Sequence, residues 1–222
     1  MVSRRQKYRT QNGMGWTAAL PGQVSEQFIA FARDCHRPVV DIGCAYGVAA
    51  IPAGAIAVDL EIGHLRAMPP ELPRVVGRFP ELAFRPGGLD AVHASNVLHF
   101  LTGEELVEGV RRMAEWLAPG GKVFVQASTP FQRPFAGFLP EFARRVAAGE
   151  AWPGWVAETR RITKYSRLHQ YPASIHLLEE TVLRRLFSDW EIEYCGYYRR
   201  HGLPASLYGD GRESVGLIAR RG

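Results

Sequence analysis

Residues 39–47 read VVDIGCAYG, and this stretch decides the expected fold. Its apolar first half predicts a short buried strand, and the small residues Gly43, Ala45 and Gly47 predict a tight turn behind that strand. Small residues let a ligand approach the backbone closely, and the start of a following helix offers unpaired N–H groups. The apolar residues 48–51 predict the first turn or two of such a helix.

A second apolar run, residues 55–58, predicts another strand, and this strand ends on Asp59. Asp59 follows Asp41 by roughly 18 residues, and a dinucleotide-binding fold places the acid that binds its ribose at about that distance. Glu61 competes with Asp59 for this role, because the next helix could begin at either residue. The order of strand, turn, helix, strand and acid predicts a nucleoside-binding βαβ unit.

The details of the turn favour one nucleoside ligand over another. Its spacing is Asp-x-Gly-x-Ala-x-Gly, whereas a dinucleotide site needs G-x-G-x-x-G to face a pyrophosphate. The Asp41 carboxylate would repel phosphate but could accept a hydrogen bond from a ligand ammonium. The turn resembles the first motif of the class I S-adenosylmethionine-dependent methyltransferases, whose loop meets the methionine part of the cofactor. Ala45 in place of the commoner middle glycine is a mild departure from that motif.

The resemblance continues in the same order along the chain. Residues 89–100 are similar to the fourth strand of that family and the active-site loop after it. Residues 104–117 have apolar side chains at helical spacing and are followed by a Pro-Gly-Gly stop signal at 119–121. Residues 122–127 then predict a fifth strand. The similar segments together cover residues 39–127.

The resemblance implies an α/β fold: a doubly wound, mostly parallel seven-stranded sheet with an antiparallel edge strand and a helical cap insertion after the fifth strand. We expect a single methyltransferase domain over residues 1–222, with an N-terminal lid or helix in 1–38 and the cap in 128–176. The cap segment is rich in aromatic residues and is too long for an ordinary connection. The other predicted elements are helices at 24–35 and 179–187 and strands at 74–79, 190–197 and 214–220.

The resemblance also implies which residues bind the cofactor. Asp59 would bind the ribose hydroxyls and Asp41 the methionine end, while Tyr46 would either lie along the methionine chain or pack within the turn. The predicted cofactor-binding residues are Asp41, Gly43, Ala45, Tyr46, Gly47, Asp59, Leu60, Arg78, Phe79, Ser95 and Asn96.

Residues that could act on the methyl acceptor follow the fourth strand or lie outside the βαβ unit. His99 is the predicted catalytic residue, a general base with a pKa near neutrality, and its alternative role is capping or packing. Tyr165 and His169 are predicted substrate contacts, with a role in an aromatic-rich lid core as the alternative. Trp16 is also a predicted substrate contact, in a segment that would form a lid over the site or an ordered tail. No His/Cys/Asp cluster has metal-ligand spacing, so we expect no metal.

Composition bounds the class of protein further. With 46% hydrophobic and 22% charged residues, the 222-residue chain is typical of a globular protein with a substantial core. No stretch approaches the ~18–20 apolar residues of a membrane span, and no apolar signal core follows the basic N-terminus. The three cysteines are scattered, which predicts reduced thiols and a cytoplasmic protein.

The formal net charge of +5 invites a nucleic-acid interpretation, but the arginines are spread along the chain. The sequence also lacks the Asn/Asp-Pro-Pro-Tyr/Phe signature that would resemble the methylases of nucleic acids or of glutamine amides. We therefore predict an S-adenosylmethionine-dependent methyltransferase acting on a small-molecule acceptor, apolar or aromatic. The alternatives are an RNA or protein methyltransferase and a non-catalytic S-adenosylmethionine-binding protein. The methylated element, the use of a general base and the oligomeric state stay open at this point.

Overall fold

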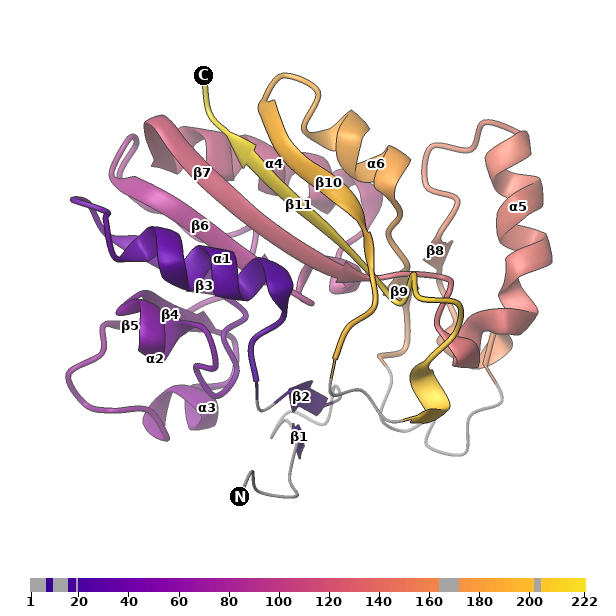
Figure 1. The fold of residues 1–222 in the computed structure, drawn as a ribbon, viewed down its shortest axis with the longest axis horizontal. Helices are drawn as coiled ribbons and strands as arrows, with labels where there is room; N and C mark the ends of the chain where they lie inside the picture. The colour runs from indigo at the N-terminus through magenta and orange to yellow at the C-terminus, as the bar shows by residue number, and fades with distance from the viewer. Residues whose placement is uncertain (1–6, 10–15, 19, 164–171, 202–204) are drawn as a thin grey trace.

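A seven-stranded sheet forms the centre of the protein in the computed structural model, which describes residues 7–9, 16–18, 20–163, 172–201 and 205–222 (Figure 1). The strand order is β10-β11-β7-β6-β3-β4-β5. The strands are β3 (Val39–Ile42), β4 (Ile56–Asp59), β5 (Arg74–Val76), β6 (Leu89–Ser95), β7 (Leu117–Ser128), β10 (Glu191–Tyr198) and β11 (Ser214–Arg220). A separate two-stranded antiparallel sheet joins β1 (Lys7–Arg9) to β2 (Trp16–Ala18).

Most neighbours in the large sheet are parallel. β3 pairs in parallel with β4 and with β6, β4 with β5, and β6 with β7. β11 runs antiparallel to both of its neighbours, β7 and β10. The predicted mostly parallel seven-stranded sheet, with its antiparallel pairing near one edge, is confirmed.

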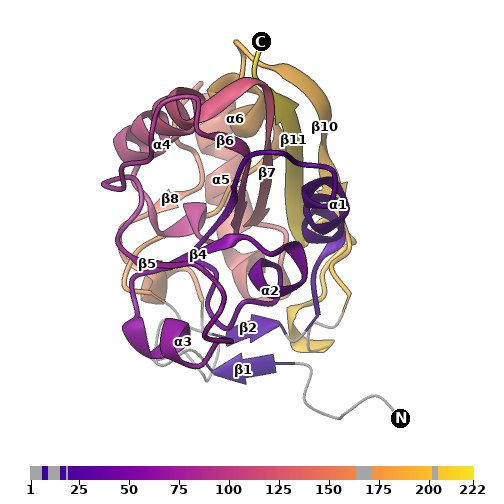
Figure 2. The same ribbon diagram turned by 90° about the vertical axis from the view of Figure 1, so that its left-hand side faces the viewer.

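Helices cover both faces of the sheet, which makes it doubly wound (Figure 2). On one face lie α1 (Gln23–Ala32), α2 (Ala50–Ala53) and α3 (Ile62–Arg66); on the other lie α4 (Gly103–Trp116) and α6 (Glu180–Leu186). Because side chains alternate along a strand, Val39 packs in the α1 layer while Val40 and Ile42 pack in the α4 layer. The same alternation directs the Asp41 side chain to the α1 side.

Helix α4 begins and ends close to where its sequence predicts. Thr102 and Glu105 form a capping box, in which each side chain accepts a hydrogen bond from the backbone N–H of the other residue. Leu106, Met113 and Trp116 then bury one face of the helix against the sheet.

Three elements differ from their predicted bounds. The helix expected from residue 48 is the single turn α2, which begins at Ala50 and ends at Ala53, followed by Gly54 in the left-handed conformation (φ +62°). The third strand, β5, ends at Val76. The strand assignment of β7 begins at Leu117 and includes the Pro-Gly-Gly segment, where Gly120 has a φ of +77° and the pairing with β6 is irregular.

The insertion after β7 builds a small core of its own. Its described elements are the 3₁₀ helix η2 (Arg133–Phe138), α5 (Leu139–Ala147), β8 (Trp155–Val156), the 3₁₀ helix η3 (Thr159–Arg161) and β9 (Ile175–His176). Phe135, Phe138 and Phe142 pack together there and are nearly fully buried. Figure 1 shows α5 beyond α6, far from α2 and α3. The predicted helical character is therefore present, mixed with a two-stranded ribbon.

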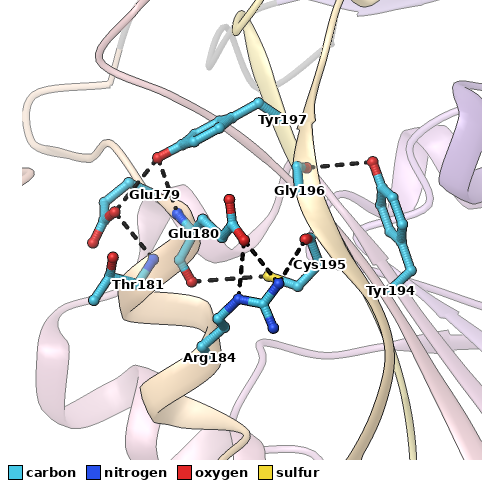
Figure 3. A network of polar contacts seen from close by, with 8 residues as sticks. All are labelled: Glu179, Glu180, Thr181, Arg184, Tyr194, Cys195, Gly196 and Tyr197. Atoms are coloured by element: carbon cyan, nitrogen blue, oxygen red, sulfur yellow. Dashed lines mark hydrogen bonds and ion pairs between the residues drawn. The ribbon is translucent and has the colours of Figure 1, made fainter.

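Polar contacts fix the edge strand β10 against α6 (Figure 3). The Tyr197 hydroxyl accepts a hydrogen bond from the backbone N–H of Glu180 at 3.2 Å and donates to the Glu179 carboxylate at 3.4 Å. Arg184 donates to the Cys195 carbonyl at 3.0 Å and pairs with Glu180 at 2.8 Å. The segment that leaves β10 therefore starts from a strand with a defined position.

Two further findings concern the cysteines and the lengths of the helices. Cys35, Cys44 and Cys195 all carry free thiols. Within the part of the chain that the structure describes, no helix is both long enough and apolar enough to cross a membrane.

Candidate functional site

A cavity of about 340 Å³ lies at the carboxyl ends of β3, β4 and β6, where open α/β sheets bind ligands. Ten of the predicted site residues line it: Asp41, Gly43, Ala45, Asp59, Leu60, Arg78, Phe79, Ser95, Asn96 and His99. They come from four separate stretches of the chain. The structure therefore brings these ten predicted residues together at one cavity.

The turn after β3 has the backbone conformation that its small residues predict. Gly43, Ala45 and Gly47 have φ values of +66°, +47° and +75°, all in the left-handed region that favours glycine. A Cβ atom built on Gly43 would lie 2.9 Å from the Val97 Cβ, so no larger residue fits there without displacing the loop after β6. The turn therefore presents bare backbone to the cavity.

Asp59, at the end of β4, holds the turn in place. Its Oδ2 accepts a hydrogen bond from the Ala45 N–H and its Oδ1 from the Glu61 N–H, each at 2.8 Å. His64 Nδ1 lies 3.2 Å from Oδ1. A carboxylate has about four lone-pair sites, so three partners leave capacity for a hydroxyl donor of a ligand. Glu61 instead caps α3 by accepting from the Gly63 N–H.

Asp41 belongs to a buried chain of three polar residues. Its Oδ1 lies 2.6 Å from His93 Nδ1, and His93 Nε2 lies 2.9 Å from the Ser25 hydroxyl. Phe28 stacks on the imidazole with ring centroids 4.7 Å apart. All three polar residues line the cavity and are at most 3% exposed, so this chain satisfies groups that burial would otherwise leave unpaired.

Sequence reasoning missed His93 and Ser25, although a signal for one of them exists. His93 is directly paired with Asp41 in the parallel register of β3 and β6. Laying the two predicted strands side by side would have indicated the contact. Ser25 comes from α1, and only the packing of that helix brings it to the imidazole.

The loop after β6 carries polar atoms without partners. Asn96 has a φ of +55°, and its side-chain amide donates to the Ser95 hydroxyl at 3.1 Å. Gln126 also donates to that hydroxyl at 3.1 Å. The Oδ1 of Asn96 and the Nδ1 of His99 are buried and have no hydrogen-bond partner among the described residues. Buried polar atoms usually have partners, so these two are candidates for ligand contacts.

Burial lowers the pKa of His99 to about 3, and the positive charge of Arg200 adds to the effect. This value lies well below the near-neutral pKa that we expected for a general base. The imidazole is neutral at physiological pH, and its free nitrogen can still accept or donate a hydrogen bond.

Arg78 and Phe79 reach the cavity from the segment after β5. The Arg78 guanidinium pairs with Glu81 at 2.7 Å and with Glu105. Phe79 is 5% exposed and packs edge-on against Trp116. Leu60 is 58% exposed, so it offers apolar surface to a ligand at the rim of the cavity.

Several predicted residues are not part of the cavity lining. Tyr46 packs against His64 with ring centroids 4.8 Å apart, so its alternative role within the turn agrees with the structure. A Cβ on Gly47 would lie 2.9 Å from Ile51, which gives this glycine a role in the turn. The Trp16 side chain, Tyr165 and His169 lie outside the described residues.

The described part of the predicted cap does not cover the cavity, since none of residues 128–163 and 172–176 lines it. The phenylalanines there pack against one another because this is how they bury their apolar area. The insertion does touch the loop after β6, since His176 Nδ1 lies 3.1 Å from the Leu101 carbonyl oxygen.

Arg200 is a further lining residue that sequence reasoning did not select. Arg199 is exposed, whereas its neighbour Arg200 is partly buried and reaches the cavity. Its position two residues after β10, a strand that ends at the same edge as β6, was the available signal.

Among the described residues, no group of three His, Cys, Asp or Glu side chains could hold a metal ion. The fold, the turn after β3 and the acid after β4 define a Rossmann-like nucleoside-binding protein. The profile of the methyltransferase domain family matches residues 40–125, which run from β3 into β7. A search of curated proteins finds no match.

Several solved structures share this fold. The chain is similar to an S-adenosylmethionine-dependent methyltransferase from Methanosarcina mazei, with a TM-score of 0.62, 14% identity and coverage of 86% of this chain and 96% of that one. A second S-adenosylmethionine-dependent methyltransferase, from Mesorhizobium loti, has a TM-score of 0.58 and 19% identity, with coverage of 83% of this chain and 91% of that one. A Thermotoga maritima protein described as a possible histamine N-methyltransferase has a TM-score of 0.58 and 13% identity, with coverage of 89% of each chain.

Residues 40–125 match the methyltransferase domain family, and the fold is that of the S-adenosylmethionine-dependent methyltransferases. The residues of the cavity fit that cofactor. A Cβ on Gly43 would fill the turn, where bare backbone can contact a ligand. The Asp59 carboxylate can accept a further hydrogen bond from a ligand hydroxyl. The volume of the cavity lies within the ~300–1,000 Å³ range of ligand sites.

Proposed function

We propose that this methyltransferase acts on a small-molecule acceptor, which binds between the cofactor and the loop after β6. We name two sides of the cavity for this purpose. The cofactor wall consists of Asp41, Gly43, Ala45 and Asp59; the acceptor wall consists of Asn96, Val97, His99, Phe100 and Arg200. The observation that carries the proposal is the composition of the acceptor wall, where unpartnered polar atoms lie beside apolar side chains.

The cofactor wall would hold the nucleoside and methionine parts. Asp59 would accept hydrogen bonds from the ribose hydroxyls, and Asp41 would pair with the methionine ammonium while His93 keeps its carboxylate in place. Leu60 and Phe79 would border the adenine, and Gly43 and Ala45 would let the methionine chain approach the backbone. The bound cofactor supplies an electrophilic methyl group on its sulfonium.

The acceptor wall would align the nucleophile and exclude water. Displacement at a sulfonium methyl needs in-line geometry more than acid–base chemistry, so positioning contributes most of the rate. Asn96 Oδ1 could accept from a donor on the acceptor, and neutral His99 could hold a hydroxyl or amine by a single hydrogen bond. Val97 and Phe100 would contact apolar parts of the molecule, which favours an acceptor with an apolar or aromatic body.

The distribution of charge favours a small molecule over RNA. Many arginines are paired with neighbouring acids: Arg37, Arg78, Arg111, Arg112, Arg144, Arg145, Arg184, Arg212 and Arg220. Paired arginines give little attraction for a phosphate backbone, because their charge is already compensated.

The test follows a labelled methyl group from S-adenosylmethionine into cellular fractions. Wild-type protein should transfer label to a metabolite extract and not to purified total RNA or to protein. Gly43→Val serves as the control, because it should fold without binding the cofactor. Label in RNA would replace the small-molecule proposal, and cofactor binding without transfer to any fraction would favour the non-catalytic alternative.

A further inference from the structure

Four residues that line the cavity carry a formal charge: Asp41, Asp59, Arg78 and Arg200. Three of them are compensated within the protein. Asp41 lies against His93, Asp59 accepts two backbone N–H groups, and Arg78 pairs with Glu81 and Glu105. Arg200 makes no hydrogen bond or ion pair with any described residue.

The surroundings of Arg200 leave its charge uncompensated. Burial lowers the pKa of its guanidinium, and the groups that act on it electrostatically are the phenols of Tyr198 and Tyr208, with no carboxylate among them. The Tyr198 hydroxyl is itself engaged, since it donates to Gln126 Oε1. An arginine stays protonated in proteins, so a positive charge faces the cavity with no acid beside it.

The backbone from which the Arg200 side chain extends is also held in place. Arg200 follows β10, which pairs with β11 along its length and is anchored to α6 by Tyr197 and Arg184 (Figure 3). A guanidinium two residues beyond an anchored strand loses less freedom when it binds a ligand than one on a free tail. The planar guanidinium matches a carboxylate through two parallel hydrogen bonds.

We propose that Arg200 binds a carboxylate of the methyl acceptor, so that the enzyme's substrates are small organic acids. This inference rests on the proposed function, since it assigns the chemical class of the molecule at the acceptor wall. The carboxylate supplies the counter-ion that the protein itself does not provide. It anchors one end of the acceptor while Asn96 and His99 contact the part that is methylated.

The carboxylate could instead be that of the cofactor's methionine. Two observations favour the acceptor. Arg200 acts electrostatically on His99, which belongs to the loop after β6 and not to the turn after β3. Its other neighbours, Tyr198 and Tyr208, also come from outside the βαβ unit of the cofactor wall.

The first experiment measures binding of matched acids and amides by calorimetry, with S-adenosylhomocysteine already bound. The probes are acetate, benzoate and phenylacetate, each compared with its neutral amide. The wild type should bind at least one acid about tenfold more tightly than its amide, since a hydrogen-bonded ion pair is lost in the amide. Arg200→Gln should abolish this preference, Arg200→Lys should keep part of it, and the exposed Arg160→Gln is the matched control.

The second experiment separates the two sources of carboxylate. Arg200→Gln should leave the affinity for S-adenosylhomocysteine within about twofold of wild type, as expected for a residue that does not touch the cofactor. A loss of S-adenosylhomocysteine affinity, with unchanged affinity for methylthioadenosine, which lacks the amino-acid part, would assign Arg200 to the cofactor and overturn the proposal.

Two other outcomes are also decisive. Equal affinity of the wild type for every acid and its amide, with S-adenosylhomocysteine still bound, would overturn the acceptor class and leave the proposed function standing. Absence of S-adenosylhomocysteine binding would instead overturn the proposed function.

The pKa of His99, followed by NMR, should rise in Arg200→Gln because a neighbouring positive charge is removed. An unchanged value would show that the guanidinium does not face His99, and would contradict the geometry on which the proposal depends.

Discussion

The cofactor wall and the acceptor wall differ in how their polar groups are satisfied. On the cofactor wall, Asp41 and Asp59 already have protein partners, and those partners hold the turn after β3 in shape. On the acceptor wall, Asn96 Oδ1, His99 Nδ1 and the Arg200 guanidinium have none among the described residues. One side is preorganised by the protein, while the other keeps hydrogen-bonding capacity that a ligand can use. Specificity for the acceptor would therefore depend on groups that are costly to leave unpaired.

The cofactor wall should be the more fragile side. Gly43→Val should abolish S-adenosylhomocysteine binding, because valine disfavours a φ of +66° and its Cβ would lie 2.9 Å from the Val97 Cβ. Calorimetry measures the loss, and circular dichroism checks that the variant folds. Gly137→Val is the control, since nothing lies within 4 Å of a Cβ placed there. Retained binding in Gly43→Val would mean that the turn is not part of the cofactor site.

Asp59→Ala should produce the next largest effect. It removes the acceptor for the ribose hydroxyls and also releases the Ala45 and Glu61 N–H groups, so S-adenosylhomocysteine affinity should fall about 100-fold. Glu61→Ala is the matched comparison, because Glu61 caps α3 and should cost tenfold or less. A larger loss in Glu61→Ala than in Asp59→Ala would assign the ribose contact to Glu61.

His99→Ala should separate the two walls. Methyl transfer to the acceptor fraction should fall at least about tenfold, while S-adenosylhomocysteine affinity stays within about twofold of wild type. Activity should not change with the ionisation of His99 between pH about 6 and about 8, because its pKa is about 3. Equal losses of turnover and cofactor affinity would place His99 on the cofactor wall.

Acidification should destabilise the fold through two buried histidines. The pKa of His99 is lowered to about 3 and that of His176 to about 4, chiefly by burial. Between these values and the ordinary pKa of about 6.5, the unfolded chain binds protons that the folded protein does not, so stability is fully present above pH about 6.5 and falls as the pH drops. Urea unfolding at pH about 7 and about 5 should differ by roughly 2 kcal/mol for each histidine. His99→Gln should reduce the difference; an unchanged pH dependence would contradict the low pKa.

The smallest effect is expected on the surface. Arg160 and Arg161 are exposed, and neither lines the cavity. The double change to Gln should leave cofactor affinity and methyl transfer to metabolites unchanged, as measured by calorimetry and label transfer. A wild-type RNA complex that weakens steeply with salt, and is lost in the double variant, would favour the RNA alternative instead.

The sequence alone determined the strand order of the nucleoside-binding unit and most of the cofactor wall. Local signals suffice there, because residues 39–59 contain the strand, the turn, the helix start and the acid in one continuous stretch. Positive φ at Gly43 and Gly47 follows from residue type, and Asp59 lies where a strand ends. His99 was found by its position after β6, but its low pKa depends on burial, which a linear sequence does not give.

Only the tertiary structure decided the contents of the acceptor wall and the position of the insertion. Arg200 reaches the cavity because β10 runs parallel to β6 through the antiparallel β11 between them, a contact between segments about a hundred residues apart. Ser25 reaches His93 through the packing of α1, and the phenylalanines of the insertion bury one another instead of a ligand. Residue pattern predicts which side chains are apolar or charged. Packing between distant segments decides which neighbours each side chain meets, and therefore whether it is buried and whether its charge is paired.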